Sequence, residues 1–448
     1  LSTYVYDPVN DQAWDVKTPT MNPQPLSMSA MRNIYARKVR HVTHDGKLNH
    51  ISPVGLWMTN PCRVIAHGGV EYAPGCRDVM FNDASNQLRV NLFRMREYPD
   101  APVVAEAVAP FYEYVDYLIP HPGERKMFLD WLACKVQNPD FRGPALFMIA
   151  EQQGTGRNTL MDIIGQMFGQ QHVKHVPFHQ LIKGSSYNTF QESLFVVVDE
   201  TLAIDDFSST RRAKDILKEI VDPRPQHATI NPKYGKQRDV WSVSSYVFLS
   251  NHYDGLKLTE GDRRFYAIDN AKSPASPEYF RAINDWMKTG GWEQHLWNDL
   301  LAKDVDPAAL AAPPEASDAM LEVIQAGMSP LEQILESFIQ QWPTNVIPRK
   351  LVRRIITLLD PNGKLIPKNI DAVFRRVWGA RLNIPSRDSS GIAANGQQYR
   401  CAVVPGTDPD INATHPEWHA TKKALENYDE TRMLGAMMSS LEDAGFDI

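Results

Sequence analysis

The sequence contains little cysteine, no long apolar run and no excess of positive charge. Its four cysteines, Cys62, Cys76, Cys134 and Cys401, form no C-x-x-C pair. This spacing argues against a structural zinc site and a disulfide framework, and reduced thiols are typical of a cytosolic compartment. Because no run of about 18 apolar residues is present, the sequence predicts no membrane-spanning helix.

The N-terminal residues, LSTYVYDPVNDQAW, have neither a basic start nor an apolar core, so we do not expect them to form a signal peptide. The chain begins with Leu rather than Met, and we interpret it as a fragment of a longer polypeptide or a processed form. Lys and Arg total 47 against 53 Asp and Glu, which gives a formal net charge of −6. The overall charge therefore indicates no nucleic-acid partner, and any basic surface has to be local.

The 448 residues, 43% hydrophobic and 22% charged, suffice for two to four globular domains and exclude wholesale disorder. Residues 1–120 carry short apolar runs without a chemical motif, so we expect an α+β accessory domain there. Between 121 and 303, apolar runs alternate with helix-like stretches, which predicts an α/β domain with a parallel sheet covered on both faces. The expected strands are 146–150, 195–200, 244–251 and 263–269, and the expected helices are 121–137, 158–169 and 209–222.

The C-terminal third has its own charge pattern. Residues 304–328 are rich in Ala and Pro and are expected to form a linker. Residues 329–405 show three helical patterns followed by a strand–turn–strand signal, which favours a winged-helix-like module with eleven basic against five acidic residues. Residues 406–448 are expected to form an acidic tail, so the net charge of −6 conceals a basic module.

The segment AEQQGTGRNTL, residues 150–160, has the context of a phosphate-binding loop, because it follows an apolar strand and opens a helix. Gly154 and Gly156 can adopt positive φ, and the N–H groups of this loop and of the helix N-terminus attract anions. Arg157 provides the cation where such loops normally have Lys. The candidate phosphate-contacting residues are Gly154, Thr155, Gly156, Arg157, Asn158 and Thr159.

This segment departs from the pattern G-x-x-x-x-G-K-[ST]. Glu151 replaces the first Gly, Arg157 replaces the Lys, and Asn158 stands where a hydroxyl residue normally holds Mg²⁺. Arg keeps the charge, but its guanidinium is larger and planar. A generic strand–turn–helix remains an alternative interpretation of these residues alone.

Polar residues at the ends of other expected strands strengthen the prediction. Asp199 and Glu200 end FVVVDE, where in phosphate-loop ATPases an Asp supports Mg²⁺ and a Glu polarises the attacking water. Asn251 ends a further strand and can hold that water. Arg263 and Arg264 precede a strand and suit an arginine finger that reaches a neighbouring subunit. The alternatives are a helix N-cap for the acids, a turn for Asn251 and a solvated salt-bridging pair for the arginines.

The order QGTGRNT, VVVDE, FLSNH and GDRRF resembles that of superfamily 3 helicases, and more narrowly the helicase part of phage and plasmid primase-helicases, over roughly 120–290. The resemblance implies an AAA+ type ATPase domain that assembles as a ring, usually a hexamer, around DNA in the bacterial host cytoplasm. ATP and Mg²⁺ would bind at subunit interfaces, with Asp199 and Asn158 as metal ligands. Glu200 would be the catalytic acid, Asn251 the sensor, and Arg263 or Arg264 the finger acting in trans.

The resemblance also implies a DNA-gripping hairpin between the acid pair and the sensor, within residues 229–243. Its tip would contain Lys233, Tyr234 and Lys236, which suit backbone contact and base stacking. An ordinary surface hairpin is the alternative. In the basic module, Arg375 and Arg376 are candidates for binding duplex or origin DNA, although docking of a protein partner remains open.

The leading hypothesis is an ATP-dependent helicase or translocase that moves single-stranded DNA during phage, plasmid or mobile-element replication. The first alternative is a non-catalytic nucleotide-binding and DNA-binding scaffold on the same fold, because Arg157 replaces Lys. The second is a primase-helicase whose primase or polymerase domain precedes Leu1, since residues 1–120 show no acid-rich metal site.

Overall fold

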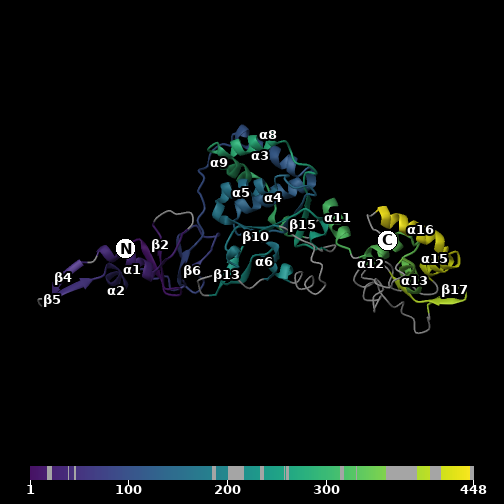
Figure 1. The fold of residues 1–448 in the computed structure, drawn as a ribbon, viewed down its shortest axis with the longest axis horizontal. Helices are drawn as coiled ribbons and strands as arrows, with labels where there is room; N and C mark the ends of the chain where they lie inside the picture. Colours follow the sequence, from purple (N-terminus) through teal and green to yellow (C-terminus); the bar gives the residue numbers. More distant parts are fainter. Residues whose placement is uncertain are drawn as a thin grey trace. The chain divides into compact units, whose positions relative to one another are not determined.

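In a computed structural model, the chain forms two compact units, Leu1–Ile324 and Gln325–Ile448 (Figure 1). Each unit is described by itself. The structure describes residues 1–17, 23–38, 40–44, 47–183, 188–199, 216–232, 237–256, 258, 262–312, 317–328, 330–359, 391–403 and 415–443.

The first unit contains a five-stranded parallel sheet in the order β10-β11-β14-β9-β15. Each neighbouring pair is parallel. The predicted parallel sheet is confirmed, but it has one strand more than the sequence analysis expected, because β10 was missed. The strands are β9 (Ala145–Ile149), β10 (Val173–Pro177), β11 (Phe195–Asp199), β14 (Ser245–Ser250) and β15 (Phe265–Asp269).

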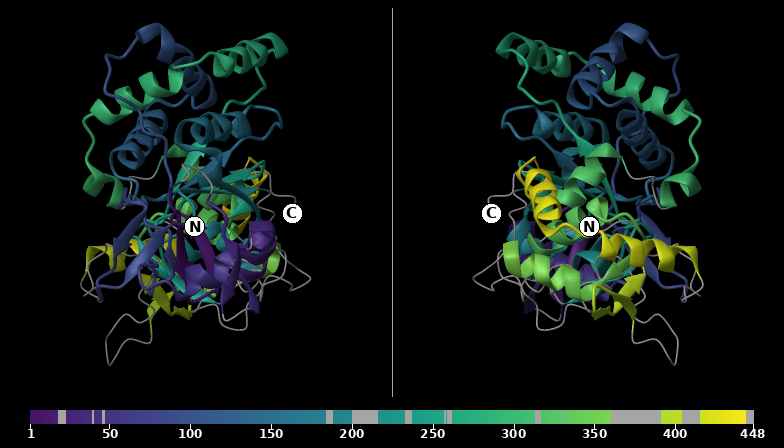
Figure 2. Two further views of the ribbon diagram at one scale, coloured as in Figure 1. Left: turned by 90° about the vertical axis from the view of Figure 1, so that its left-hand side faces the viewer. Right: turned by 90° about the vertical axis from the view of Figure 1, so that its right-hand side faces the viewer.

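Alternate residues of these strands enter two different cores, as the two-residue repeat of a strand requires. In β9, Leu146 and Met148 join the core of one face, whereas Phe147 and Ile149 join the core of the other. The first face is covered by α3 (Ala105–Leu118), α4 (Pro122–Gln137), α5 (Arg157–Phe168), α8 (Pro277–Lys288) and α9 (Trp292–Ala302). Figure 2 shows α3, α8 and α9 together at the top of both turned views.

The second face of the sheet is covered by α6 (Phe178–Lys183), by the helical residues 216–220 and by α11 (Asp318–Ala326). The expected helices at 121–137 and 158–169 are confirmed as α4 and α5. The expected helix at 209–222 is described only over 216–220, because 201–215 lie outside the described residues. Short 3-10 turns occur at η2 (Gln170–His172), η3 (Thr189–Gln191) and η4 (Tyr253–Gly255).

An antiparallel hairpin, β12 (Gln226–Ile230) and β13 (Arg238–Ser242), lies in the chain between β11 and β14. The N-terminal hundred residues form small sheets and short helices. These elements are β1 (Tyr4–Asp7), β2 (Gln12–Asp15), β3 (Leu26–Ser27), α1 (Met28–Tyr35), η1 (Ala36–Lys38), β4 (Arg40–His44), β5 (Lys47–Ile51), α2 (Pro53–Thr59), β6 (Val70–Glu71), β7 (Met80–Asn82) and β8 (Leu88–Asn91).

Residues after β6 and β8 join the large core through a buried histidine. The Tyr72 hydroxyl lies 2.7 Å from Nδ1 of His172, and Nε2 of His172 lies 2.6 Å from the carbonyl oxygen of Arg94. A carbonyl oxygen only accepts, so Nε2 carries the proton and Nδ1 accepts from Tyr72. Burial lowers the pKa of His172 to about 4, which keeps the ring neutral.

The second unit has its own core of helices and short strands. Its hairpin turns at Asn395 and Gly396, both with positive φ (49° and 71°), which a two-residue type I′ turn requires. The two strands of this hairpin are β17 and β18. The elements are α12 (Pro330–Gln341), β16 (Val346–Pro348), α13 (Arg349–Leu359), β17 (Ile392–Ala394), β18 (Gln397–Tyr399), β19 (Cys401–Val403), α15 (Pro416–Glu426) and α16 (Glu430–Asp443).

Helices also form in the two segments that were expected to be a linker and an acidic tail. In 304–328, α10 (Pro307–Ala311) and α11 form, and Met320 and Val323 of α11 enter the core beneath the sheet. In 406–448, Trp418, Leu425 and Met437 of α15 and α16 are buried in the core of the second unit. Among the described residues of this segment, 416–426 and 430–443 are therefore helices packed against this core.

The four cysteines are unpaired, and burial raises the pKa of Cys134 to about 11 and that of Cys401 to about 12. Among the described helices, none is both long enough and apolar enough to cross a bilayer.

Candidate functional site

The loop between β9 and α5, here called the phosphate loop (residues 151–159), has the backbone of an anion site. Gly154 and Gly156 have φ of 81° and 101°, and Gly156 is the N-cap of α5 without a side-chain capping bond. The first N–H groups of the helix are therefore available to a ligand, and the helix dipole favours a negative one. A Cβ on Gly154 would meet only Pro274, at 3.8 Å, so the loop leaves space beside it.

Gly156 is held from behind by Tyr114 of α3. The Tyr114 hydroxyl donates to the Gly156 carbonyl oxygen at 2.6 Å, and burial raises the pKa of Tyr114, which keeps it a donor. A Cβ on Gly156 would lie 2.1 Å from that hydroxyl oxygen. Next to it, Thr155 is buried, and its hydroxyl has no hydrogen-bond partner among the described residues. These features fit a loop that binds phosphate through its backbone.

Arg157 begins α5, and its guanidinium turns back toward the sheet. Its Nη1 donates to the carbonyl oxygens of Met148, at 3.1 Å, and Ser250, and its Nη2 donates to Oδ1 of Asn251 at 2.5 Å. One side chain thus spans the ends of β9 and β14. Burial lowers the pKa of Arg157, and the charge of Asp199 opposes that shift.

Asp199 ends β11, at the same edge of the sheet. Its Oδ2 lies 3.2 Å from Nδ1 of His175, which comes from the neighbouring strand β10. This hydrogen bond is the largest cause of a raised pKa at His175. The Asp199 side chain is 37% exposed, so it remains accessible to a ligand beside this contact.

The parallel sheet brings the predicted residues together because the carboxyl ends of its strands share one edge. The phosphate loop, Asn251 and Asp199 follow the three adjacent strands β9, β14 and β11. Asn158 is exposed on the first turn of α5. The described residues contain no group of three or more His, Cys, Asp or Glu that could hold a metal alone. Mg²⁺ at nucleotide sites commonly uses one or two carboxylates with phosphate oxygens, so Asp199 still fits such an ion.

Arg263 and Arg264 lie at the amino ends of the strands, whereas the phosphate loop lies at their carboxyl ends. They precede β15, whose first residue pairs with the first residue of β9, and the Ala145 N–H donates to the Arg264 carbonyl oxygen at 2.8 Å. The Arg264 backbone N–H donates to Oδ1 of Asp262 at 3.1 Å, and its Nη1 lies 3.5 Å from the same oxygen. Neither arginine is therefore placed at the phosphate loop of its own chain.

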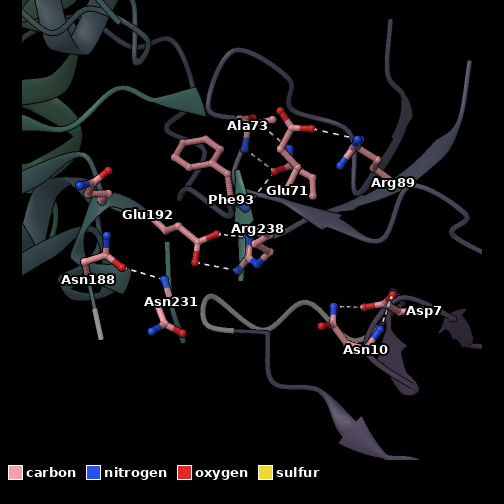
Figure 3. A network of polar contacts seen from close by, with 12 residues as sticks. Asp7, Asn10, Glu71, Ala73, Arg89, Phe93, Asn188, Glu192, Asn231 and Arg238 are labelled. Carbon is pink, nitrogen blue, oxygen red and sulfur yellow. Dashed lines mark hydrogen bonds and ion pairs between the residues drawn. The ribbon is translucent and has the colours of Figure 1, made fainter. Parts of the chain in front are cut away.

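The hairpin β12–β13 is fastened to the segment that precedes β11. Nδ2 of Asn188 donates to the Thr229 carbonyl oxygen at 2.8 Å, and Oδ1 of Asn188 accepts from the Asn231 N–H at 2.7 Å. Glu192 and Arg238 form a two-bonded ion pair at 2.6 and 2.9 Å (Figure 3). Burial raises the pKa of Glu192, and Arg238 opposes that shift.

Arg142 ties down the other end of the hairpin. Its side chain is almost fully buried and donates to the carbonyl oxygens of Ser244, at 2.9 Å, Ile220 and Arg224. These carbonyl groups lie just before β12 and just after β13. These hydrogen bonds therefore fix the base of the hairpin to the sheet.

Several predicted residues lie outside the described residues. These are Glu200, the hairpin-tip residues Lys233, Tyr234 and Lys236, and the module residues Arg375 and Arg376. Within the described part of the basic module, Nη2 of Arg354 donates to Glu430 of α16 at 3.0 Å, and Lys350 donates to Gln397 at 2.8 Å. Arg354 and Lys350 therefore already bind side chains of their own unit.

Three groups of residues that support the site and the hairpin could not be identified from the sequence. His175 lies in a short run, VKHVP, that carries no motif, and its contact with Asp199 depends on the pairing of β10 with β11. Tyr114 lies forty-two positions before Gly156. Asn188 and Glu192 anchor the hairpin from a turn that has no distinctive pattern. Only the apolar positions of VKHVP offered a signal, as a possible edge strand.

The family described as a family of unknown function (DUF5906) matches residues 148–264, a range that includes the phosphate loop, Asp199 and Asn251. No curated protein matches the chain.

Two solved structures of the apo NrS-1 C-terminal region are similar to this chain. The A form is 17% identical, with a TM-score of 0.62, and the match covers 90% of this chain and 96% of that chain. The second is 16% identical, with a TM-score of 0.60, over 90% and 95%. JCV helicase aligns over 53% of this chain and 65% of that chain, at 11% identity and a TM-score of 0.26, too low to establish a common fold. The chain therefore shares its mixed α/β fold with the NrS-1 C-terminal region.

Proposed function

We propose that this chain is an ATP-dependent DNA helicase or translocase of the superfamily 3 type, and that it acts on single-stranded DNA in the replication of a phage, plasmid or other mobile element. One observation carries the proposal. A glycine loop that opens a helix, a carboxylate and an amide follow the three adjacent strands β9, β11 and β14 and meet at one sheet edge. That combination suits a nucleoside triphosphate with its metal ion.

In this proposal, the N–H groups of the phosphate loop and the helix N-terminus hold the ATP phosphates, and Arg157 adds a positive charge. Asp199 and Asn158 hold Mg²⁺, which, when bound, neutralises charge on the phosphates. Glu200 orients and polarises the attacking water, and Asn251 contacts the γ-phosphate. Thr159, on the first turn of α5, lies next to the Tyr114 hydroxyl behind the loop.

The position of Arg263 and Arg264 supports a ring. Because they lie at the sheet edge opposite the phosphate loop, they suit an arginine finger for the nucleotide of a neighbouring subunit rather than their own. A head-to-tail interface that closes on itself gives a ring, and we propose a homo-oligomer, with six subunits as in the helicases that the sequence resembles.

Contacts with DNA are proposed for two regions. The fixed base of the β12–β13 hairpin supports a tip, with Lys233, Tyr234 and Lys236, that contacts single-stranded DNA. Arg375 and Arg376 of the basic module are proposed to contact duplex or origin DNA. A primase or polymerase, on a partner or on an upstream domain, would supply primers to the same replication system.

A second candidate function is a nucleotide-binding scaffold without turnover. It is favoured by the bonds of Arg157, whose guanidinium is engaged by Met148, Ser250 and Asn251 rather than extended from the loop. An Arg157→Lys variant that hydrolyses ATP while the wild type does not would establish this second candidate.

The test of the proposed site is equilibrium binding of ATP with Mg²⁺ to the full chain, beside two variants. Gly156→Val should abolish binding, because its side chain would collide with Tyr114. Glu200→Gln should bind ATP as tightly as the wild type, because the change spares the phosphate contacts. A wild-type chain that binds no ATP, or a Gly156→Val variant that binds it normally, would exclude this site.

A further inference from the structure

The contact between Arg157 and Asn251 constrains the chemistry of the amide. A guanidinium group has five N–H donors and no acceptor, so the Asn251 atom that faces it must be the carbonyl oxygen. Nη2 of Arg157 lies 2.5 Å from Oδ1 of Asn251, so the two groups are hydrogen-bonded and the donor is charged. The side-chain amide of Asn251 is therefore held in one of its two orientations.

The consequence concerns the other end of the amide. With Oδ1 bound to Arg157, the Nδ2 group is the part of Asn251 left for a ligand, and the structure gives it no partner among the described residues. Asn251 is half-buried and follows β14, between the strands that lead to the phosphate loop and to Asp199. In the proposed ATP site, a group at this place would face the γ-phosphate. An ionised γ-phosphate only accepts hydrogen bonds.

We propose that Arg157 is a positioning residue that locks the Asn251 amide with its N–H groups toward the nucleotide, so that the site distinguishes ATP from ADP. The inference rests on the proposed ATP site and adds the device by which that site recognises the γ-phosphate. The lock requires a donor that reaches Oδ1 of Asn251 while it is itself fixed in place. The carbonyl groups of Met148 and Ser250 fix it.

The shape of the side chain explains why arginine serves here. Its planar fork binds acceptors on two strands at once through Nη1 and still reaches Asn251 through Nη2. These three bonds leave two N–H groups, one on Nε and one on Nη2, for a phosphate. A lysine has three donors on one atom at the end of a shorter chain, so it cannot keep all three protein contacts and also bind a phosphate.

The experiment measures the dissociation constants of ATP and ADP with Mg²⁺ for the full-length wild type, Arg157→Lys, Asn251→Ala and the double variant. The wild type should prefer ATP, and each single variant should lose about tenfold of that preference, the worth of one hydrogen bond to a charged group. The double variant should lose no more than either single one, because both changes remove the same contact. Affinity for ADP should change less than about threefold in Asn251→Ala, since ADP has no γ-phosphate.

Asn251→Asp provides the matched control, and it also covers the case that Arg157→Lys fails to fold. The carboxylate keeps an acceptor for Arg157 but removes the N–H donors. This variant should melt at or above the wild-type temperature and should still lose its preference for ATP. An Asn251→Asp variant with the wild-type preference would show that the N–H groups of Asn251 do not contact the γ-phosphate.

Three results would overturn the inference. These are additive losses in the double variant, an Arg157→Lys variant with wild-type preference, and an Asn251→Asp variant that still prefers ATP. A wild type that binds neither nucleotide would refute the proposed ATP site and the inference together. A wild type that binds ATP and ADP equally would refute the inference alone.

Discussion

The hydroxyl group of Tyr114 lies 2.6 Å from the carbonyl oxygen of Gly156, and a Cβ on Gly156 would lie 2.1 Å from the same hydroxyl. Helix α3 therefore packs directly against the phosphate loop at Gly156. Gly154, only two residues away, has open space beside it. The two glycines share a positive φ but differ in their surroundings, which makes them a matched pair for mutation.

Replacement of these glycines by alanine should have unequal effects. Gly154→Ala should cost about 1–2 kcal/mol, the strain of a positive φ. Gly156→Ala should cost roughly 2 kcal/mol more, because overpacking against Tyr114 is added. Thermal unfolding measures both, and Tyr114→Phe should restore part of the stability of Gly156→Ala but none of that of Gly154→Ala. Equal losses in the two variants would contradict the close contact.

The ion pair of Glu192 and Arg238 should control how firmly the hairpin is held. Glu192→Gln leaves Arg238 beside a neutral group in a half-buried place, and breaking such a pair typically costs about 3 kcal/mol or less at partial exposure. We expect a lower melting temperature and weaker single-stranded DNA binding. Asp285→Asn, which disrupts the exposed pair with Lys288, is the control and should change neither. Normal DNA binding by Glu192→Gln would show that DNA binding does not depend on how firmly the hairpin is held.

Stability should fall in mild acid because of His172. Its pKa of about 4 in the folded chain lies below the ordinary value of 6.5, so the unfolded chain binds a proton first as the pH falls. The stabilisation is fully present above pH 6.5 and is lost between there and about pH 4, to a total of about 3 kcal/mol. Denaturant unfolding across this range, compared with His172→Gln, measures the loss. An equally steep pH dependence in the variant would assign the effect to other groups.

If Arg264 acts on the ATP of a neighbouring subunit, two inactive variants should complement each other. Glu200→Gln and Arg264→Ala should each lack turnover, whereas an equal mixture should regain roughly a quarter of the wild-type rate, from interfaces that combine both intact residues. Phosphate release after mixing and reassembly measures this. No recovery, together with gel-filtration evidence of mixed rings, would contradict action in trans. Arg263→Ala in place of Arg264→Ala identifies which arginine acts.

The sequence predicted those parts of the fold whose pattern is local. The buried strands β9, β11, β14 and β15 are continuous apolar runs, and α4 and α5 have clear helical spacing. Strand β10 was missed because it is an edge strand in which only Val173 and Val176 are buried. The packing of α15 and α16 into the second core was not predicted, because the excess of acidic residues identified 406–448 only as an acidic tail.

The residues of the candidate site, too, could be predicted only where their pattern is local. Glycines, an acid and an amide at strand ends are visible in the sequence, and the parallel sheet brings them to one edge. The direction in which Arg157 points is not visible, because it depends on the carbonyl groups of Met148 and Ser250. The contacts of Tyr114 and His175 likewise depend on elements that meet only in the folded chain.

The central claim, a working ATP site driven by DNA, is tested most directly by the rate of phosphate release from ATP with Mg²⁺, with and without single-stranded DNA. The account predicts slow release alone, faster release with DNA, and no release by Glu200→Gln in either case. ATP binding without release, with DNA present, would contradict it and would favour the nucleotide-binding scaffold.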